Sequence, residues 1–234
     1  CWGQGFESPT LHQNSRAKAR EFYLFTFHFS LFTIDFLFHC TAFSVRAFSA
    51  KITAKQKAII MEIKQLDKKE YAGRKFIARY KTNGYYDICP DDNGFTVRYE
   101  CFGSTVERSF EDVFFAEWLE DPVAFGAFKN GELIGFAECA PESWNNRFRI
   151  SNICVFGGEN RGRGVGTALM HSAESAARKA GARMLVLETQ TCNENAIAFY
   201  KKNGFSIIGF DLYSYSNDDP ARHEVRIEMG KRLK

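Results

Sequence analysis

A basic, glycine-rich turn constrains this chain more than any other feature, because it lies between an apolar run and an amphipathic helix pattern. The turn reads Arg161-Gly162-Arg163-Gly164-Val165-Gly166; the apolar run before it spans 150–156, and the helical pattern begins at Val165. Glycines let the backbone approach a ligand closely, and the free N–H groups and dipole of a helix N-terminus favour an anion. The segment therefore predicts a phosphate-binding turn.

The chain from Met61 onward carries strand and helix patterns separated by short turns. Asn130-Gly131 between apolar runs is a strong hairpin signal, a second turn is expected at 144–147, and Gly181 and Gly204 stand where helices would end. Strands are predicted at 95–102, 123–128, 132–138, 148–156, 184–187, 205–215 and 224–231. Helices are predicted at 68–74, 109–119, 165–180 and 193–204.

Residues 1–60 differ in composition from the rest of the chain. They hold ten of the 24 phenylalanines, and the first methionine is Met61. An apolar run such as 22–43 can indicate a membrane segment or a targeting leader, but Asp35, His28 and His39 interrupt it and it lacks a helical period. We expect an upstream stretch outside the natural protein, with a processed leader and a membrane contact as alternatives, and one domain over 61–234.

The charge balance and the cysteine spacing limit which partners and which cellular compartment are expected. Residues 1–60 hold seven of the 31 basic and three of the 28 acidic residues, so the remainder carries 24 against 25 and a formal net charge of −1. Neither nucleic acid nor a membrane is therefore expected as a partner.

Five cysteines follow Met61 without a C-x-x-C pair, so no metal site or disulfide framework is indicated. A cytoplasmic location is expected.

The class of the glycine-rich turn is decided by its neighbours. A Walker A loop needs Gly-Lys-Ser/Thr, but Thr167 follows Gly166 directly, and a dinucleotide fingerprint needs the first helix of a parallel βαβ unit. The turn matches instead the pattern Arg/Gln-x-x-Gly-x-Gly/Ala, as Arg161-x-x-Gly164-x-Gly166. Preceded by an antiparallel meander, it resembles the acyl-coenzyme A loop of the GNAT family of N-acetyltransferases.

A second motif matches the same family independently. It is the segment Asn193-x-x-Ala196-x-x-x-Tyr200-x-x-x-Gly204-Phe205, about thirty residues after the turn. The resemblance covers 95–234 closely and 61–94 loosely. Within the family the chain is similar to streptothricin acetyltransferases and related bacterial acetyltransferases. That similarity is carried by Leu187-Glu188-Thr189-Gln190, Phe199-Tyr200, Gly209-Phe210-Asp211 and Tyr215-Ser216-Asn217.

The resemblance implies a fold and a co-substrate. The fold is mixed α/β (α+β), with a mostly antiparallel central sheet of about six to seven strands, about four flanking helices and a splayed parallel strand pair. The co-substrate is acetyl-CoA, without a metal, its pantetheine arm lying between strands 150–156 and 184–189. The residues expected to bind it are Ile153, Cys154, Val155, Arg161, Gly162, Arg163, Gly164, Val165, Gly166, Thr167, Asn193 and Tyr200. Asn193 also fits a plain helix cap, and both arginines fit solvated charges.

Tyr200 is the residue expected to act as general acid. Acetyl transfer to an amine expels a thiolate, which a phenol placed near the sulfur can protonate. The family uses its matching tyrosine in this way. The alternative is a core aromatic on the apolar helix face with Ala196 and Phe199.

The attacking amine must be neutral, so a group must take its proton directly or through water. Many relatives have a glutamate on the strand before the turn, but Ser151 and Asn152 occupy that region here, and neither is a base. Three carboxylates could substitute by contacting the acceptor or its proton: Glu188, which is the first candidate, Glu138 and Asp211. Trp144, Tyr213 and Tyr215 could line the acceptor pocket. Surface charge or ordinary packing is the alternative for each, and a water relay without a dedicated base is also open.

These residues predict an N-acetyltransferase that moves an acetyl group from acetyl-CoA to a primary amine of a small cationic molecule, such as streptothricin. Acidic positions near a pocket would suit such an acceptor. Acetylation of protein or peptide amines and a non-catalytic acyl-CoA sensor remain as alternatives, and a membrane-tethered form rests only on the phenylalanine-rich leader. Homodimerisation is common among similar proteins, but no feature of the sequence measures it.

Overall fold

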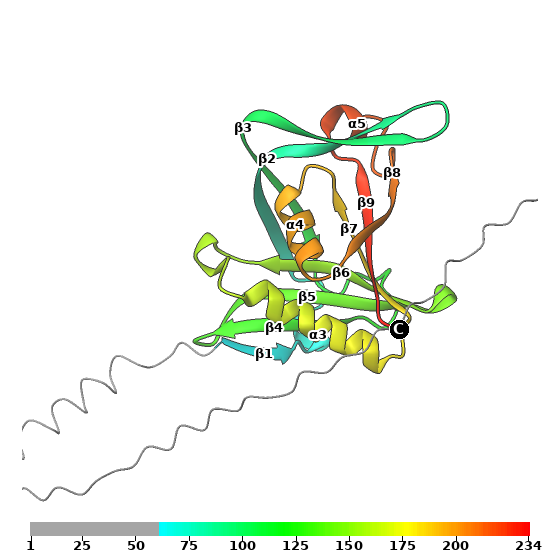
Figure 1. Cartoon of the computed structure of the whole chain (residues 1–234). Coiled ribbons are helices and arrows are strands. Elements are labelled where there is room, and N and C mark those ends of the chain that lie inside the picture. The colour runs from blue at the N-terminus through cyan, green and yellow to red at the C-terminus, as the bar shows by residue number, and fades with distance from the viewer. Residues whose placement is uncertain (1–60) are drawn as a thin grey trace, which may run out of the picture. The chain divides into compact units, whose positions relative to one another are not determined.

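The computed structural model describes residues 61–234, so the expectations for 1–60 lie outside the described residues. A seven-stranded sheet in the order β1-β4-β5-β6-β7-β9-β8 forms the centre (Figure 1). Its strands are β1 Met61–Gln65, β4 Val123–Lys129, β5 Glu132–Glu142, β6 Arg147–Val155, β7 Met184–Gln190, β8 Ser206–Asp211 and β9 Arg226–Arg232. Neighbouring strands are antiparallel except β6 and β7, which confirms the predicted mixed sheet with one parallel pair.

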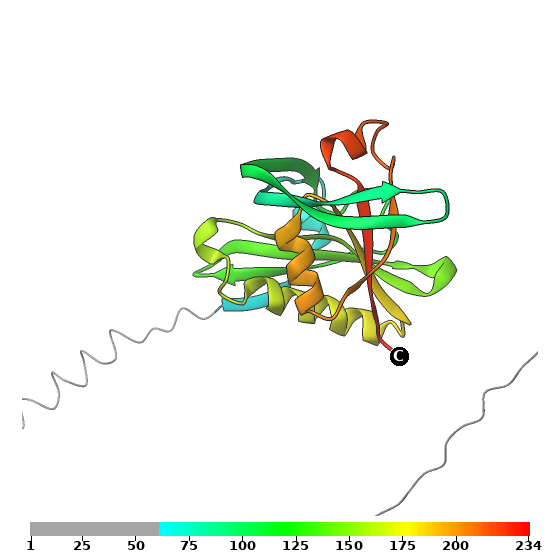
Figure 2. The ribbon, with the colours of Figure 1, turned by 45° about the horizontal axis from the view of Figure 1, so that its top comes forward.

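A second sheet consists of one long antiparallel hairpin. Its strands are β2 Lys75–Pro90 and β3 Phe95–Val113. The described helices are α2 Lys68–Tyr71, α3 Val165–Lys179, α4 Glu194–Lys202 and α5 Asp219–Arg222, with 3-10 turns η1 Ser143–Asn145 and η2 Gly158–Asn160. In Figure 2 the hairpin passes in front of the sheet, close to the N-terminal end of α4.

Helices α3 and α4 pack on one face of the central sheet. Met170 of α3 and Ile197 of α4 are at most 1 % exposed and pack among sheet residues such as Leu187 and Ile227. Leu169 of α3 is fully buried and packs with Ile134 and Ala137 of β5. Successive side chains of a strand point to opposite faces. Phe136 of β5 accordingly lies on the other face, packed against the start of β2 and the segment after β3. The core therefore has two layers, one on each side of the sheet.

The turns follow the local sequence. Asn130 and Gly131 have φ values of 53° and 85°, as a two-residue primed hairpin turn requires. Gly181 ends α3 with φ 70°, and the amide of the next residue, Ala182, donates to the Ala177 carbonyl at 3.0 Å. Both features confirm the sequence prediction, because glycine and asparagine tolerate the left-handed backbone region.

Several predicted boundaries were wrong. Residues 109–119 are not a helix: they continue β3 to Val113 and then turn, because 109–113 pair with 75–79 of β2. The helix predicted at 68–74 ends at Tyr71. The strand predicted at 132–138 extends to Glu142, and the one predicted at 205–215 ends at Asp211. Pairing with a distant strand, absent from any local pattern, decided the strand lengths, whereas the helix ends just before Gly73, whose φ is 77°.

Candidate active site

Strands β6 and β7 run together and then separate. Arg147–Ile150 pair with Met184–Leu187, and beyond these four residues the two strands have no register with each other. On the opposite side, β6 stays paired with β5, and β7 stays paired with β9 through Gln190. We call the separated segments, 151–155 and 188–190, the splay. It confirms the predicted splayed pair.

A β-bulge lies where the splay begins. Glu138 of β5 pairs with Asn152, and the next residue, Cys139, pairs with Ile150, so Ser151 is the extra residue on β6. A bulge bends its strand and increases the local twist. Because Ile150 is also the last residue of β6 that pairs with β7, the bulge gives a physical reason for the separation of the two strands.

The backbone of β6 offers hydrogen-bonding groups to the splay. The Phe156 amide donates to the Ile134 carbonyl of β5 at 2.8 Å. In an antiparallel pair this direction alternates, so the N–H and C=O groups of Ile153 and Val155 point away from β5. Consistent with this, the Val155 carbonyl accepts a hydrogen bond from Arg161 Nε at 3.4 Å. At Ile153 and Val155 the splay thus presents backbone groups that have no partner strand.

The glycine-rich turn lies at the end of β6 and leads into α3. Gly162 and Gly164 have φ values of 71° and 83°, which favour glycine, and α3 begins at Val165. The first amides of a helix have no partner within it, so those of Val165, Gly166 and Thr167 are available to a ligand. Gly166 lets α3 approach α4, since a Cβ there would lie 3.3 Å from the Phe199 ring.

The predicted arginines differ in their contacts. The Arg161 guanidinium donates to the carbonyls of Val155 and Arg79, so it links the turn to β2 and lies beside the splay. Arg163 is exposed on the turn. The side chain of Val165 is buried in the core, which leaves only its backbone for a ligand.

Tyr200 projects from α4 toward the splay. Asn193 caps this helix by accepting a hydrogen bond from the Ala196 amide at 3.4 Å. Tyr200 is 7 % exposed, and it belongs to the same apolar cluster as Ile150 and Ile153, which flank the bulge. Burial, and secondarily the nearby Cys154 thiol, raise the pKa of Tyr200 above its ordinary value. The phenol therefore keeps its proton across the neutral range.

Glu138 lies on the opposite face of the sheet and is completely buried. Its carboxylate accepts hydrogen bonds from the Phe115 amide at 2.6 Å, Ser151 Oγ at 3.2 Å and Asn152 Nδ2 at 3.4 Å. Asn152 also donates to Asp112 of β3 at 3.1 Å. Burial raises the pKa of Glu138, hydrogen bonds from Phe115, Asn152 and Ser151 partly oppose this, and Asp112 adds to the increase.

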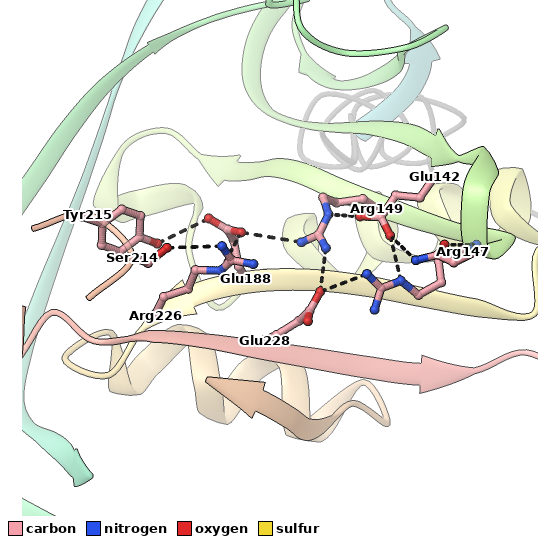
Figure 3. Close-up of polar contacts among 9 residues, drawn as sticks. Glu142, Arg147, Arg149, Glu188, Ser214, Tyr215, Arg226 and Glu228 are labelled. Atoms are coloured by element: carbon pink, nitrogen blue, oxygen red, sulfur yellow. Dashed lines mark hydrogen bonds and ion pairs between the residues drawn. The ribbon is translucent and has the colours of Figure 1, made fainter. Parts of the chain in front are cut away.

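Glu188 is the first β7 residue of the splay and belongs to an ion-pair network on this face (Figure 3). Its carboxylate lies 3.1 Å from Arg226 Nε and 3.6 Å from Arg149 Nη1, and it accepts a hydrogen bond from Tyr215 at 3.3 Å. The network combines three glutamates and three arginines from four strands: Glu142, Arg147, Arg149, Glu188, Arg226 and Glu228. Its formal charges cancel.

The network should make stability depend on pH. Burial alone would raise the pKa of Glu142, but hydrogen bonds from Arg149 and Arg147 outweigh it and hold the pKa below the ordinary 4.5. A depressed folded-state pKa stabilises the fold above the ordinary pKa, and this contribution is lost as the pH falls through the folded value. Glu142→Gln should cost about 1–3 kcal/mol in the free energy of unfolding at pH 7. The difference from wild type should shrink below pH 4.5. Urea unfolding at several pH values measures this.

The exposed Glu117→Gln serves as the control for that experiment, since it changes a carboxylate without an ion pair among the described residues. We expect its unfolding free energy to follow wild type at every pH. A constant difference between Glu142→Gln and wild type from pH 7 to pH 3 would contradict the role of the network.

Three predicted acceptor residues lie away from the splay. Trp144 is 84 % exposed on η1, at the end of β6 opposite to the glycine-rich turn. Asp211 ends the edge strand β8 and accepts a hydrogen bond from the amide of Tyr213, which is itself exposed. The structure therefore brings Tyr200, Glu138, Glu188 and the glycine-rich turn to the splay, but not these three.

Sequence reasoning missed several residues beside the splay. Tyr80 of β2 donates to Gln190 of β7 at 3.0 Å, and its oxygen lies 3.4 Å from Cys192 Sγ. Arg149 and Asp112 were also not predicted. No motif marks these side chains. Tyr80 and Asp112 lie on β2 and β3, which only the tertiary fold brings near the splay, and Arg149 precedes the bulge on β6.

The strand order, the splay and the glycine-rich turn define an acetyltransferase fold of the GNAT type. A sequence model described as the Acetyltransferase (GNAT) family matches residues 93–205. Streptothricin acetyltransferase A of Bacillus subtilis is 34% identical over 141 residues, which cover 58% of this chain and 79% of that protein. The chain belongs to the GNAT family.

Other relatives carry related names. A streptothricin acetyltransferase of Streptomyces lavendulae is 42% identical over 93 residues, 40% of this chain and 48% of that protein. The alignment thus spans about half of that relative. The solved structure of a nourseothricin acetyltransferase superposes with a TM-score of 0.61 at 28% identity, covering 74% of this chain and 99% of its own. A Bacillus anthracis protein assigned as a streptothricin acetyltransferase, solved with acetyl coenzyme A, gives 0.57 at 25% identity, covering 76% and 100%.

The described residues offer neither a metal site nor a membrane-spanning helix. Within 61–234, no group of three or more His, Cys, Asp or Glu side chains is placed to hold a metal ion. Over the same residues, no helix has the length and apolar character needed to span a membrane.

Proposed function

We propose that the protein is an acetyl-CoA-dependent N-acetyltransferase whose acceptor is a primary amine of a small cationic molecule, streptothricin or a compound like it. The arrangement at the splay carries the proposal: strand-edge groups without a partner strand, a glycine-rich helix N-terminus at one end, and a buried phenol beside the bulge. The names of the relatives support the same chemistry.

The residues at the splay fit an acyl-coenzyme A. The amides from Gly162 to Thr167 are suited to the pyrophosphate, because a helix N-terminus favours an anion, and Arg161 and Arg163 add positive charge. The backbone groups of Ile153 and Val155 can pair with the pantetheine amides as an added strand would. Cys154 lies between them, and Asn193 lies at the start of α4, across the splay from β6.

Tyr200 acts as the general acid in this proposal. The amine nitrogen attacks the thioester carbonyl, the C–S bond breaks, and the phenol gives its proton to the departing thiolate. Its raised pKa keeps the donor form populated. Because Tyr200 lies on the α4 face of the splay, the acceptor approaches from the opposite face, where Glu138, Glu188 and Tyr215 lie.

The described cysteines support a cytoplasmic location. All five, Cys89, Cys101, Cys139, Cys154 and Cys192, are free thiols. Free thiols persist in a reducing compartment, and we propose the cytoplasm on this ground.

A thiol-release assay tests the proposed function. The protein is incubated with acetyl-CoA and with streptothricin, lysine or a peptide bearing a free N-terminus. We expect turnover with streptothricin well above the rate without acceptor, and mass spectrometry should show one added acetyl group. Turnover only with the peptide would identify a protein or peptide acetyltransferase. Coenzyme binding by calorimetry without thiol release from any amine would indicate a sensor and would overturn the enzyme.

A further inference from the structure

A cationic acceptor must lose a proton before it can attack, and two of the groups beside the splay are unsuited to take it. Both carboxylate oxygens of Glu188 are engaged: one lies 3.1 Å from Arg226 Nε and 3.6 Å from Arg149 Nη1, and the other accepts a hydrogen bond from Tyr215. Tyr200 already holds its proton and is needed as a donor. A different base is therefore required on the acceptor face.

Glu138 differs from Glu188 in its electrostatic surroundings. Among the ion pairs of residues 61–234, none involves Glu138 or its neighbour Asp112. Burial without a cationic partner raises the pKa of Glu138 above its ordinary value, which increases its affinity for a proton. The charged and titratable side chain facing it is Asp112 of β3; Ser151, Asn152 and the Phe115 amide supply its hydrogen bonds.

Ser151 connects this buried carboxylate to the splay. As the extra residue of the bulge, it shares the Glu138 face with Asn152, and its Oγ lies 3.2 Å from Glu138 Oε2. Ser151 is partly exposed, whereas Glu138 is fully buried. On either side of the bulge, Ile150 and Ile153 pack in the cluster of Tyr200 on the opposite face. The general acid and the Ser151 hydroxyl therefore approach the start of the splay from its two faces.

We propose that Glu138 is the proton acceptor of the reaction and that the Ser151 hydroxyl relays the proton to it. The inference rests on the proposed function. The ammonium N–H gives its proton to Ser151 Oγ, while the Ser151 hydroxyl proton passes to Glu138 Oε2. The products are a neutral amine, an unchanged serine and a protonated Glu138, so charge and protons balance. Glu138 on β5 thus takes the role of proton acceptor, because Ser151 and Asn152 on β6 are not bases.

The pH profile of kcat/KM for streptothricin tests the relay in Glu138→Gln. At pH 7 the acceptor amine is protonated, so we expect a loss of roughly 100-fold without the base. Near pH 10, about the pKa of an alkyl amine, much of the acceptor is already neutral, and the loss should fall below about tenfold. A purely structural role would give the same loss at both pH values and would overturn the relay.

Variants at Ser151 keep the test valid if Glu138→Gln folds poorly. Ser151→Ala retains the carboxylate and its Phe115 contact, and should show the same pH-dependent loss, whereas Ser151→Thr restores a hydroxyl and should recover most of the activity. Glu132→Gln, exposed at the start of β5, is the matched control and should behave as wild type. If the wild type is active and Ser151→Ala has the same activity, the relay is overturned and the proposed function stands. If the wild type is inactive, the proposed function is overturned as well.

Discussion

Tyr200→Phe should lower kcat by roughly 100-fold or more, the usual contribution of a positioned general acid. The substitution removes only the hydroxyl, and the ring keeps its packing against Phe199 and Phe205. We therefore expect an unchanged thermal unfolding midpoint and a KM for acetyl-CoA within about twofold of wild type, because the loss concerns a transition-state interaction. Steady-state thiol release with saturating acceptor measures both constants.

Tyr71→Phe is the matched control for this experiment. Tyr71 packs against Phe114, within the cluster of the other sheet face, and should retain full kcat without its hydroxyl. A Tyr200→Phe enzyme with kcat within twofold of wild type would show that Tyr200 is a core aromatic, the alternative that its sequence position left open.

Phe136→Ala should destabilise the fold by about 3–5 kcal/mol, the range for large-to-small changes at a buried phenylalanine. Phe136 is fully buried, and its ring centroid lies 4.3 Å from that of Phe114 and 4.8 Å from that of Phe76. It thereby joins β5 to β2 and to the segment that supplies the Phe115 amide to Glu138. Because a domain of this kind is stabilised by only about 5–15 kcal/mol, urea unfolding should show a large shift of the midpoint.

Phe110→Ala provides the comparison for that measurement. Phe110 on β3 is 48 % exposed, so its truncation should change the free energy of unfolding by less than about 1 kcal/mol. Equal effects of the two substitutions would contradict the assignment of Phe136 to the core that holds β2 on the sheet.

Local patterns predicted the parts of the site that lie along one segment. The turn at Arg161–Gly166 needs glycines at its left-handed positions and a helix directly after it, and both requirements are visible in six consecutive residues. The same holds for Asn193, whose distance from Ala196 marks a helix cap, and for Tyr200 at helical spacing from it. These features depend on neighbours in sequence, so residue type and spacing suffice.

The helix wrongly predicted at 109–119 shows where such patterns fail. Residues 109–113 have no strong local preference, and their pairing with β2, some thirty residues away in sequence, makes them a strand. Strand preference depends mainly on cross-strand packing and burial, which a local window does not contain.

The sequence by itself determined the family, the glycine-rich turn and the place of Tyr200 on its helix, because glycine spacing and helix periodicity act over a few residues. Only the tertiary structure decided the surroundings of each carboxylate. It placed Glu188 between two arginines and buried Glu138 without one, at a bulge that turns Ser151 and Asn152 toward it. Ion pairs and burial arise from strands that meet only in the folded sheet, so the contacts of each carboxylate depend on the whole fold.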